Sequence, residues 1–135
     1  MKNNQLTSFD MQTNSTLLTL QLSDNAINRF ELGGNESLVE LILTGNKLTT
    51  FRAGANSTLV YLHLQSNELE ELDLGTNRSI KKLSIFNNPA LRTISHLPVS
   101  LNWLNADKQA VESFDFKKCH NLKRIEIKNG ETSRE

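Results

Sequence analysis

Asparagine recurs along this chain with a spacing that alternates between 10 and 11 residues over eight successive intervals. Composition alone does not produce such a pattern, so the chain is built from 21-residue repeats that each contain two half-units. A repeat of this length requires a fold in which equivalent residues stack on one another, as in a solenoid. The asparagines of this pattern are Asn4, Asn14, Asn25, Asn35, Asn46, Asn56, Asn67, Asn77 and Asn88.

Each half-unit ends in a short pattern that is typical of a β-strand. Residues 25–32 read N-x-I-x-x-F-x-L, and residues 35–43 read N-x-x-L-x-x-L-x-L. In both, the last two apolar positions are two residues apart, which is the period of a strand that buries one face. We therefore expect a flattened coil with one short strand on each side and its apolar residues turned inward. No coil can bury these residues alone, so neighbouring coils stabilise one another.

The 135 residues accommodate about six coils. We expect a mainly β solenoid domain over residues 1–129, with short parallel strands on both faces and little or no α-helix. The pattern weakens in the last two coils, where Gln109 continues the first asparagine series and Pro98 and Cys119 occupy the second. Such decay is expected of terminal repeats. Residues 130–135 are predicted to form a polar C-terminal tail.

The recurring asparagines have a structural explanation. A short turn between strands leaves backbone N–H and C=O groups without strand partners, and an asparagine amide can both donate and accept. We therefore expect two asparagine ladders, one for each half-unit, with the amides stacked from coil to coil. Four of these residues also begin an N-x-S/T sequon. Because the sequon period equals the repeat period, we favour a turn function over glycan attachment. The four are Asn14, Asn35, Asn56 and Asn77.

The longer half-unit carries the signature L-x-x-L-x-L-x-x-N-x-[LI]. It is complete over residues 17–27 and recurs over 38–48, 59–69 and, with one extra residue, 80–91. The chain thus resembles leucine-rich-repeat proteins, and its nested 10 + 11 division is similar to their IRREKO type, which is common in bacterial proteins. The resemblance implies a right-handed solenoid whose concave face is lined by the strands of the longer half-unit. It also implies a binding scaffold, because catalysis in such proteins usually lies in other domains.

Aromatic side chains gather on the expected concave face. Its outward positions hold Tyr61, His63, Phe86 and Trp103 on three consecutive coils. Tyrosine and tryptophan offer the large, stiff and partly polar surface of a protein-binding hot spot. Lys82 and Arg124 lie in the same outward column as Tyr61. In the functional interpretation, these two cations contact an acidic partner. These residues form the predicted binding surface: Tyr61, His63, Phe86, Trp103, Lys82 and Arg124. The alternatives are that the rings fill a cross-strand ladder and that the charges form a solvated face.

The charge balance argues against several partners. Lys plus Arg and Asp plus Glu both number 15, so no net charge favours nucleic acid, and the aromatic interleaving is too thin for it. The halves differ, since residues 1–77 carry four bases and nine acids (4 − 9 = −5) and residues 78–135 carry eleven and six (11 − 6 = +5). This asymmetry could steer a partner, or bring copies of the chain together end to end.

Catalysis and metal binding have little support in the sequence. His63, His96 and His120 fall in different coils, and the adjacent Cys119 and His120 do not have zinc-ligand spacing. We expect no catalytic residues, no metal and no cofactor. An enzymatic function would require a second domain, or the convergence of His63 with an acid such as Glu40 or Asp107.

We therefore expect a non-catalytic scaffold that binds another protein through the concave strand face. The alternative is an assembly module that associates through open solenoid ends, with the N-terminal edge as the self-association surface. No apolar run is long enough to span a bilayer, and no secretory leader opens the chain. The sequence favours a cytoplasmic location, or a secreted one if a leader has been removed.

Overall fold

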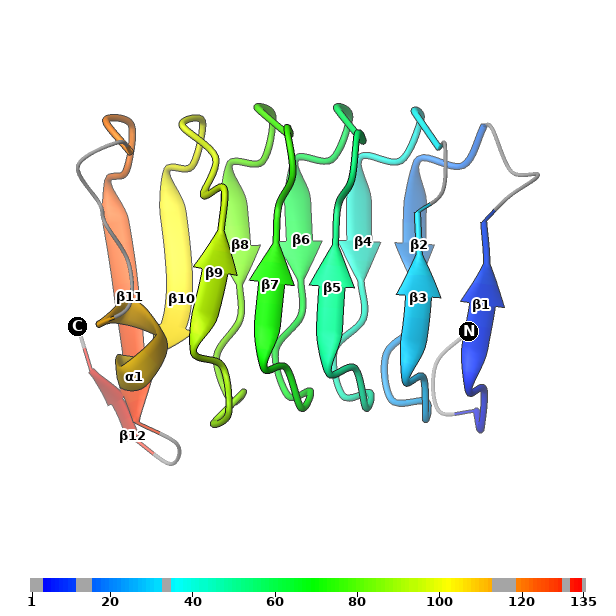
Figure 1. Ribbon diagram of the computed structural model, residues 1–135, viewed down its shortest axis with the longest axis horizontal. Helices are drawn as coiled ribbons and strands as arrows, with labels where there is room; N and C mark the ends of the chain where they lie inside the picture. Colours follow the sequence, from blue (N-terminus) through cyan, green and yellow to red (C-terminus); the bar gives the residue numbers. More distant parts are fainter. Residues whose placement is uncertain (1–3, 12–15, 33–34, 113–118, 130–131, 135) are drawn as a thin grey trace.

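The computed structural model describes residues 4–11, 16–32, 35–112, 119–129 and 132–134. Its fold is mainly β, with parallel sheets stacked as a β-solenoid of about five turns (Figure 1). This confirms the expected fold class and the strands on both faces. The sixth 21-residue segment is described only in part. The strand predicted for its shorter half-unit, around Phe114, lies outside the described residues.

The six strands of the longer half-unit and the C-terminal β12 form one seven-stranded sheet in the order β12-β11-β10-β8-β6-β4-β2. From β2 to β11 the strands are parallel and begin 21 residues apart, so each pairs with its equivalent in the next coil. The last strand, β12, pairs antiparallel with β11. The bounds are β2 (Thr19–Gln21), β4 (Glu40–Ile42), β6 (Tyr61–His63), β8 (Lys82–Ser84), β10 (Trp103–Asp107), β11 (Arg124–Asn129) and β12 (Thr132–Arg134).

The strands of the shorter half-unit cover the other side of the solenoid in two separate sheets. One sheet contains β1 and β3, and the other has the order β5-β7-β9. Glu71 pairs with Thr93, 22 residues on, because the chain carries one extra residue before Leu91. The bounds are β1 (Ser8–Asp10), β3 (Arg29–Glu31), β5 (Thr50–Arg52), β7 (Glu71–Asp73) and β9 (Thr93–Ser95).

The core lies between the two sides, and strand alternation fills it. The central residue of each three-residue strand from β1 to β9 turns inward, so Leu62 and Leu83 are fully buried on one side and Phe51 and Leu72 are 1% exposed on the other. Each coil therefore contributes one large apolar residue from each strand, and stacking removes these residues from water.

The first asparagine ladder uses the same contacts in successive coils. Asn67 Nδ2 donates to Leu64 O in its own coil and to Leu43 O in the preceding coil, both at 3.0 Å. Its Oδ1 accepts the Leu48 N–H at 3.1 Å. One amide thus satisfies three backbone groups that the turn leaves without strand partners. The series comprises Asn25, Asn46, Asn67 and Asn88, with the exposed Asn4 at its N-terminal end.

The second ladder closes the other turn. Asn56 Oδ1 accepts the N–H groups of Thr58 at 3.1 Å and Leu59 at 3.0 Å, and its Nδ2 donates to Asn35 O at 2.8 Å. The Asn56 side chain is 2% exposed, so the nitrogen that a glycan would need is buried and already engaged. Asn35 and Asn77 accept the same pair of N–H groups in their own turns, and Asn14 lies outside the described residues.

Left-handed backbone recurs at the turns after β5, β7 and β9. Gly54 and Gly75 both have φ of +58°, and His96 has φ of +60°. A Cβ at Gly75 would collide with the carbonyl oxygen of Gly54 in the preceding coil. Glycine is therefore required at position 75 for two reasons: the backbone is left-handed there, and two coils approach each other closely.

The C-terminal coil departs from the repeat while keeping its contacts. A four-residue helix, α1 (Lys108–Val111), follows β10, which agrees with the expectation of little α-helix. Gln109 Nε2 donates to Asn88 O at 3.0 Å, and Cys119 Sγ contacts Pro98 O at 3.7 Å, so both substitutes occupy the ladder positions. The segment expected to be a tail contains β12. Its polar residues gave no apolar alternation from which a strand could be predicted.

Candidate functional site

Strand register aligns the predicted binding residues in rows across the seven-stranded sheet. Tyr61 pairs with Lys82, Lys82 with Trp103, and Trp103 with Arg124, so these four residues lie side by side on adjacent strands. His63 lies two residues beyond Tyr61 on the same strand and faces the same way. Phe86 follows β8 by two residues, where its carbonyl oxygen accepts the Ser66 N–H at 3.0 Å.

Tyr61 and Lys82 are both exposed and lie in contact with each other. The Tyr61 side chain is 37% exposed, and the Lys82 ammonium lies 5.8 Å from the centre of its ring. This distance is within the range of a cation–π contact, which contributes about 0.5–1 kcal/mol at an exposed site. Trp103 and Phe86 are half-buried, so each presents part of its ring to solvent. The arrangement combines aromatic area with one positive charge.

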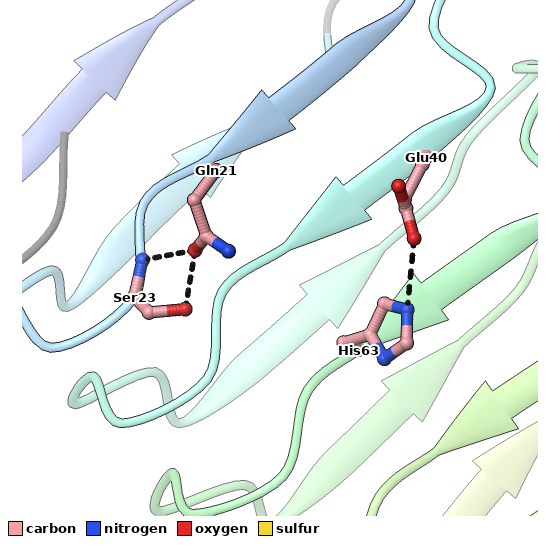
Figure 2. A network of polar contacts seen from close by, with 4 residues as sticks. All are labelled: Gln21, Ser23, Glu40 and His63. Carbon is pink, nitrogen blue, oxygen red and sulfur yellow. Dashed lines mark hydrogen bonds and ion pairs between the residues drawn. The ribbon is translucent and has the colours of Figure 1, made fainter.

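His63 meets an acid across the sheet. Its Nε2 lies 3.3 Å from Glu40 Oε2, and the side chains are 30% and 34% exposed (Figure 2). The contact is an ion pair when the imidazole is protonated and a hydrogen bond when it is neutral. Figure 2 also shows Gln21 and Ser23, two coils before His63, where Gln21 Oε1 accepts from the Ser23 N–H at 2.9 Å and from its hydroxyl. The face thus carries two separate polar contacts, one at the end of β2 and one between β4 and β6.

The pairing of His63 with Glu40 is the convergence that an enzymatic function would require. Ser84 lies directly opposite His63 in the strand register, but its Oγ has no hydrogen-bond partner among the described residues. A serine nucleophile needs a base within hydrogen-bond reach, and that contact is not made here. Asp107 does not meet His63, because its carboxylate accepts the N–H groups of Asn87 at 3.0 Å and Asn88 at 2.8 Å.

Beside the aromatic residues lie two buried polar side chains that the sequence pattern placed on the surface. Ser84 is 3% exposed and Asn105 is 6% exposed, although both occupy outward positions of the sheet. Ser84 Oγ, Asn105 Oδ1 and Gln65 Oε1 are buried and without a hydrogen-bond partner in the described part of the chain. The sequence signal that was missed is the presence of small polar residues beside Trp103 and Phe86, whose rings can cover them.

Arg124 is less available than its position in the sequence suggested. Its guanidinium donates to Glu126 Oε1 at 2.7 Å, from a side chain that is 62% exposed to one that is 19% exposed. This contact lies within β11 and orients the arginine along its own strand. Lys82 is therefore the more accessible cation of the predicted surface.

Within the described ranges, no group of three or more His, Cys, Asp or Glu side chains could hold a metal ion. No helix among the same residues is long and apolar enough to cross a membrane. Comparison of the chain with protein-family models, with curated proteins and with solved structures gave no match.

Proposed function

We propose that this chain is a leucine-rich-repeat scaffold, of the nested 21-residue type, that binds another protein without catalysing a reaction. The binding surface is the aromatic face, defined as Tyr61, His63, Lys82, Phe86 and Trp103, with Arg124 at its margin. The observation that carries the proposal is the register that aligns Tyr61, Lys82 and Trp103 on adjacent strands. The leucine-rich-repeat assignment is supported by the signature, whose leucines occupy the core while its asparagine forms the first ladder.

The chemistry of the aromatic face suits a protein partner. Tyrosine and tryptophan have few torsions to immobilise, and short paired strands hold their backbones before binding, so association loses little entropy. The exposed Lys82 favours a partner with an acidic group at the centre of its contact surface. Buried Ser84 lies two residues before Phe86, and buried Asn105 lies two residues after Trp103 on the same strand.

The test is affinity capture from a native lysate with wild-type chain and a Tyr61→Ser, Phe86→Ser, Trp103→Ser variant as baits. A matched control carries Glu71→Ser, Arg92→Ser and Thr93→Ser on the opposite side, and circular dichroism establishes that all three chains fold. We expect a partner retained by the wild type and the control and lost by the aromatic variant. Equal capture by all three chains would refute the aromatic face as the binding surface.

A second candidate function is self-association through the N-terminal edge. Leu18, immediately before β2, is 60% exposed, and β2 pairs with β4 alone among the described strands. An exposed edge strand beside an exposed leucine favours strand addition by another chain. Light scattering after size-exclusion chromatography tests this proposal. A mass that rises with concentration in the wild type and not in Leu18→Ser would support it, and a constant monomer mass would exclude it.

A further inference from the structure

The strands on the side opposite the aromatic face are interrupted between β3 and β5. The Ala53 N–H donates to Asp73 O at 2.9 Å and joins the end of β5 to β7. One coil earlier, the equivalent bond would run from the Leu32 N–H to Arg52 O, and it is not formed between these two described residues. The Leu32 N–H thus has no hydrogen-bond partner in the described part of the chain, and two strand edges face each other without a ladder.

The interruption is confined at both ends. Before the strands, the Lys47 N–H donates to Ile27 O at 2.8 Å. Beyond them, Asn56 Nδ2 donates to Asn35 O, also at 2.8 Å. The two coils are therefore joined on each side of an opening only a few residues long. In Figure 1, β3 and β5 run next to each other on the near side of the solenoid.

A hollow of about 530 Å³ occupies this opening. Leu32 and Ala53 contribute to its floor, and the charged residues among its lining are Arg29, Glu31 and Arg52. Its volume falls within the range of about 300–1,000 Å³ that is usual for ligand-binding pockets. The floor residues are almost fully buried, so the exposed lining is largely polar and suits a hydrophilic group.

Ala53 contributes to the space of the hollow. It occupies the inward position that follows the strand, where three other coils carry Met11, Leu32 and Leu74 and the coil of β9 carries the exposed His96. Alanine has fewer apolar carbon atoms than the residues that fill this position in those three coils. The loss of those contacts weakens the packing where the strand ladder opens.

The lining offers one cation without an ion pair to a described residue. Two arginines and one glutamate give a net charge of +1 (2 − 1), and the Arg29 guanidinium lies 3.5 Å from the Glu31 carboxylate with both side chains largely exposed. Arg52 forms no ion pair with a described residue, so its guanidinium is available. Glu71 and Asp73 on the adjacent strand bring the local charge to −1 (2 − 3), so an anion is held here by direct hydrogen bonds rather than by the net charge, and a polyanion such as nucleic acid is repelled.

We propose that this hollow binds an acidic side chain of a short extended peptide segment from a partner. Its carboxylate accepts hydrogen bonds from the Arg52 guanidinium and from the unpaired Leu32 N–H. A charge-assisted bond and an open backbone donor together match a carboxylate better than a neutral amide. Because the opening is closed at both ends, the peptide contacts it over only a few residues. This site lies on the other side of the solenoid from the aromatic face and does not depend on the function proposed for it.

The experiment is an NMR titration of ¹⁵N-labelled full chain with defined peptide pools. One pool contains acetylated, amidated pentapeptides with glutamate at the centre and threonine or valine elsewhere, and the other replaces the glutamate with glutamine. We expect the glutamate pool to shift amide signals over residues 28–32 and 50–54, with saturation at or below about 1 mM. Weaker or absent shifts are expected with the glutamine pool.

Variants and small anions make the result decisive. Arg52→Gln should weaken the titration at least fivefold, whereas the exposed Arg92→Gln should leave it unchanged. Ala53→Leu should fill the hollow and abolish the shifts in a chain whose spectrum remains dispersed. Trp103→Ser should bind the peptides normally, which separates this site from the aromatic face. Equal binding of both pools, equal shifts with sodium acetate or phosphate alone, or unchanged binding by Arg52→Gln would each overturn the proposal.

Discussion

On one side of the solenoid, six parallel strands pair without interruption from β2 to β11, whereas on the other side the ladder stops between β3 and β5. The asparagine contacts continue past that interruption, because Asn46 Oδ1 still accepts the Ile27 N–H at 3.0 Å and Asn56 still reaches Asn35. The comparison teaches that the turn asparagines hold the register of the coils. Strand pairing can therefore open locally without a shift of the repeat, and the opening lies beside Ala53, the small residue of the inward column.

The largest expected effect comes from removing a large residue of that column where the ladder is intact. Leu74 is fully buried, and Leu74→Ala should lower the free energy of unfolding by about 2–5 kcal/mol, because it deletes buried carbon atoms and leaves a cavity. Urea denaturation measures this loss. Leu18→Ala is the matched control, since its leucine is 60% exposed and should change stability by less than about 0.5 kcal/mol. Similar losses in the two variants would contradict the packing argument.

The asparagine ladder gives the next largest effect. Asn67→Ala should lower the free energy of unfolding by about 2–4 kcal/mol. It leaves the Leu48 N–H and the carbonyl groups of Leu64 and Leu43 buried with fewer hydrogen-bond partners. Hydrogen exchange should accelerate at the Leu48 amide. The exposed Asn121, whose Nδ2 makes one contact at 3.2 Å to Val99 O, provides the comparison variant Asn121→Ala. A ladder variant as stable as this control would show that the strands, and not the turns, hold the coils in register.

Much of this architecture could be predicted from the sequence, because the 21-residue spacing sets which residues become cross-strand neighbours. The pairing of Tyr61 with Lys82 and the strand through Phe51 both follow from counting residues. What could not be predicted depends on the third dimension. Covering of the outward Ser84 depends on where neighbouring rings turn, and the opening above Ala53 depends on how two coils settle around a missing side chain.

Filling the opening between β3 and β5 should change the free energy of unfolding by less than Leu74→Ala or Asn67→Ala, and in the opposite direction. Ala53→Leu restores the residue size of the column, and we expect it to raise the free energy of unfolding by about 1 kcal/mol through new apolar contact. Exchange of the Leu32 amide should slow if the ladder closes. The exposed Ala90→Leu serves as the control and should be neutral. Destabilisation by Ala53→Leu would mean that the hollow is shaped by the backbone and that a larger side chain overpacks it.

The smallest expected effect concerns the sheet of β5, β7 and β9, where Asp73 accepts from His96 Nδ1 at 2.9 Å and from the Gly75 N–H at 2.8 Å. The hydrogen bond from His96 and then that from Gly75 lower the pKa of Asp73 below its usual 3.8, and the nearby charge of Arg52 acts in the same direction. A lowered folded-state pKa stabilises the fold above the unfolded pKa, and this stabilisation is lost as the pH falls through the folded one. The wild type should therefore exceed Asp73→Asn in stability at pH 6, and the difference should shrink below about pH 4.

The stability difference between the wild type and Asp73→Asn should not exceed about 0.5 kcal/mol. The Asp73 and His96 side chains are 41% and 66% exposed, so water screens the pair. Urea midpoints at pH 6, about 4 and about 3 measure it. Glu71→Gln, on the same strand and without an ion pair to a described residue, should follow the wild type throughout. A difference that grows as the pH falls would mean that the neutral carboxyl, and not the carboxylate, is the form that the fold stabilises. The contacts from His96 and Gly75 would then contribute nothing through the charge of Asp73.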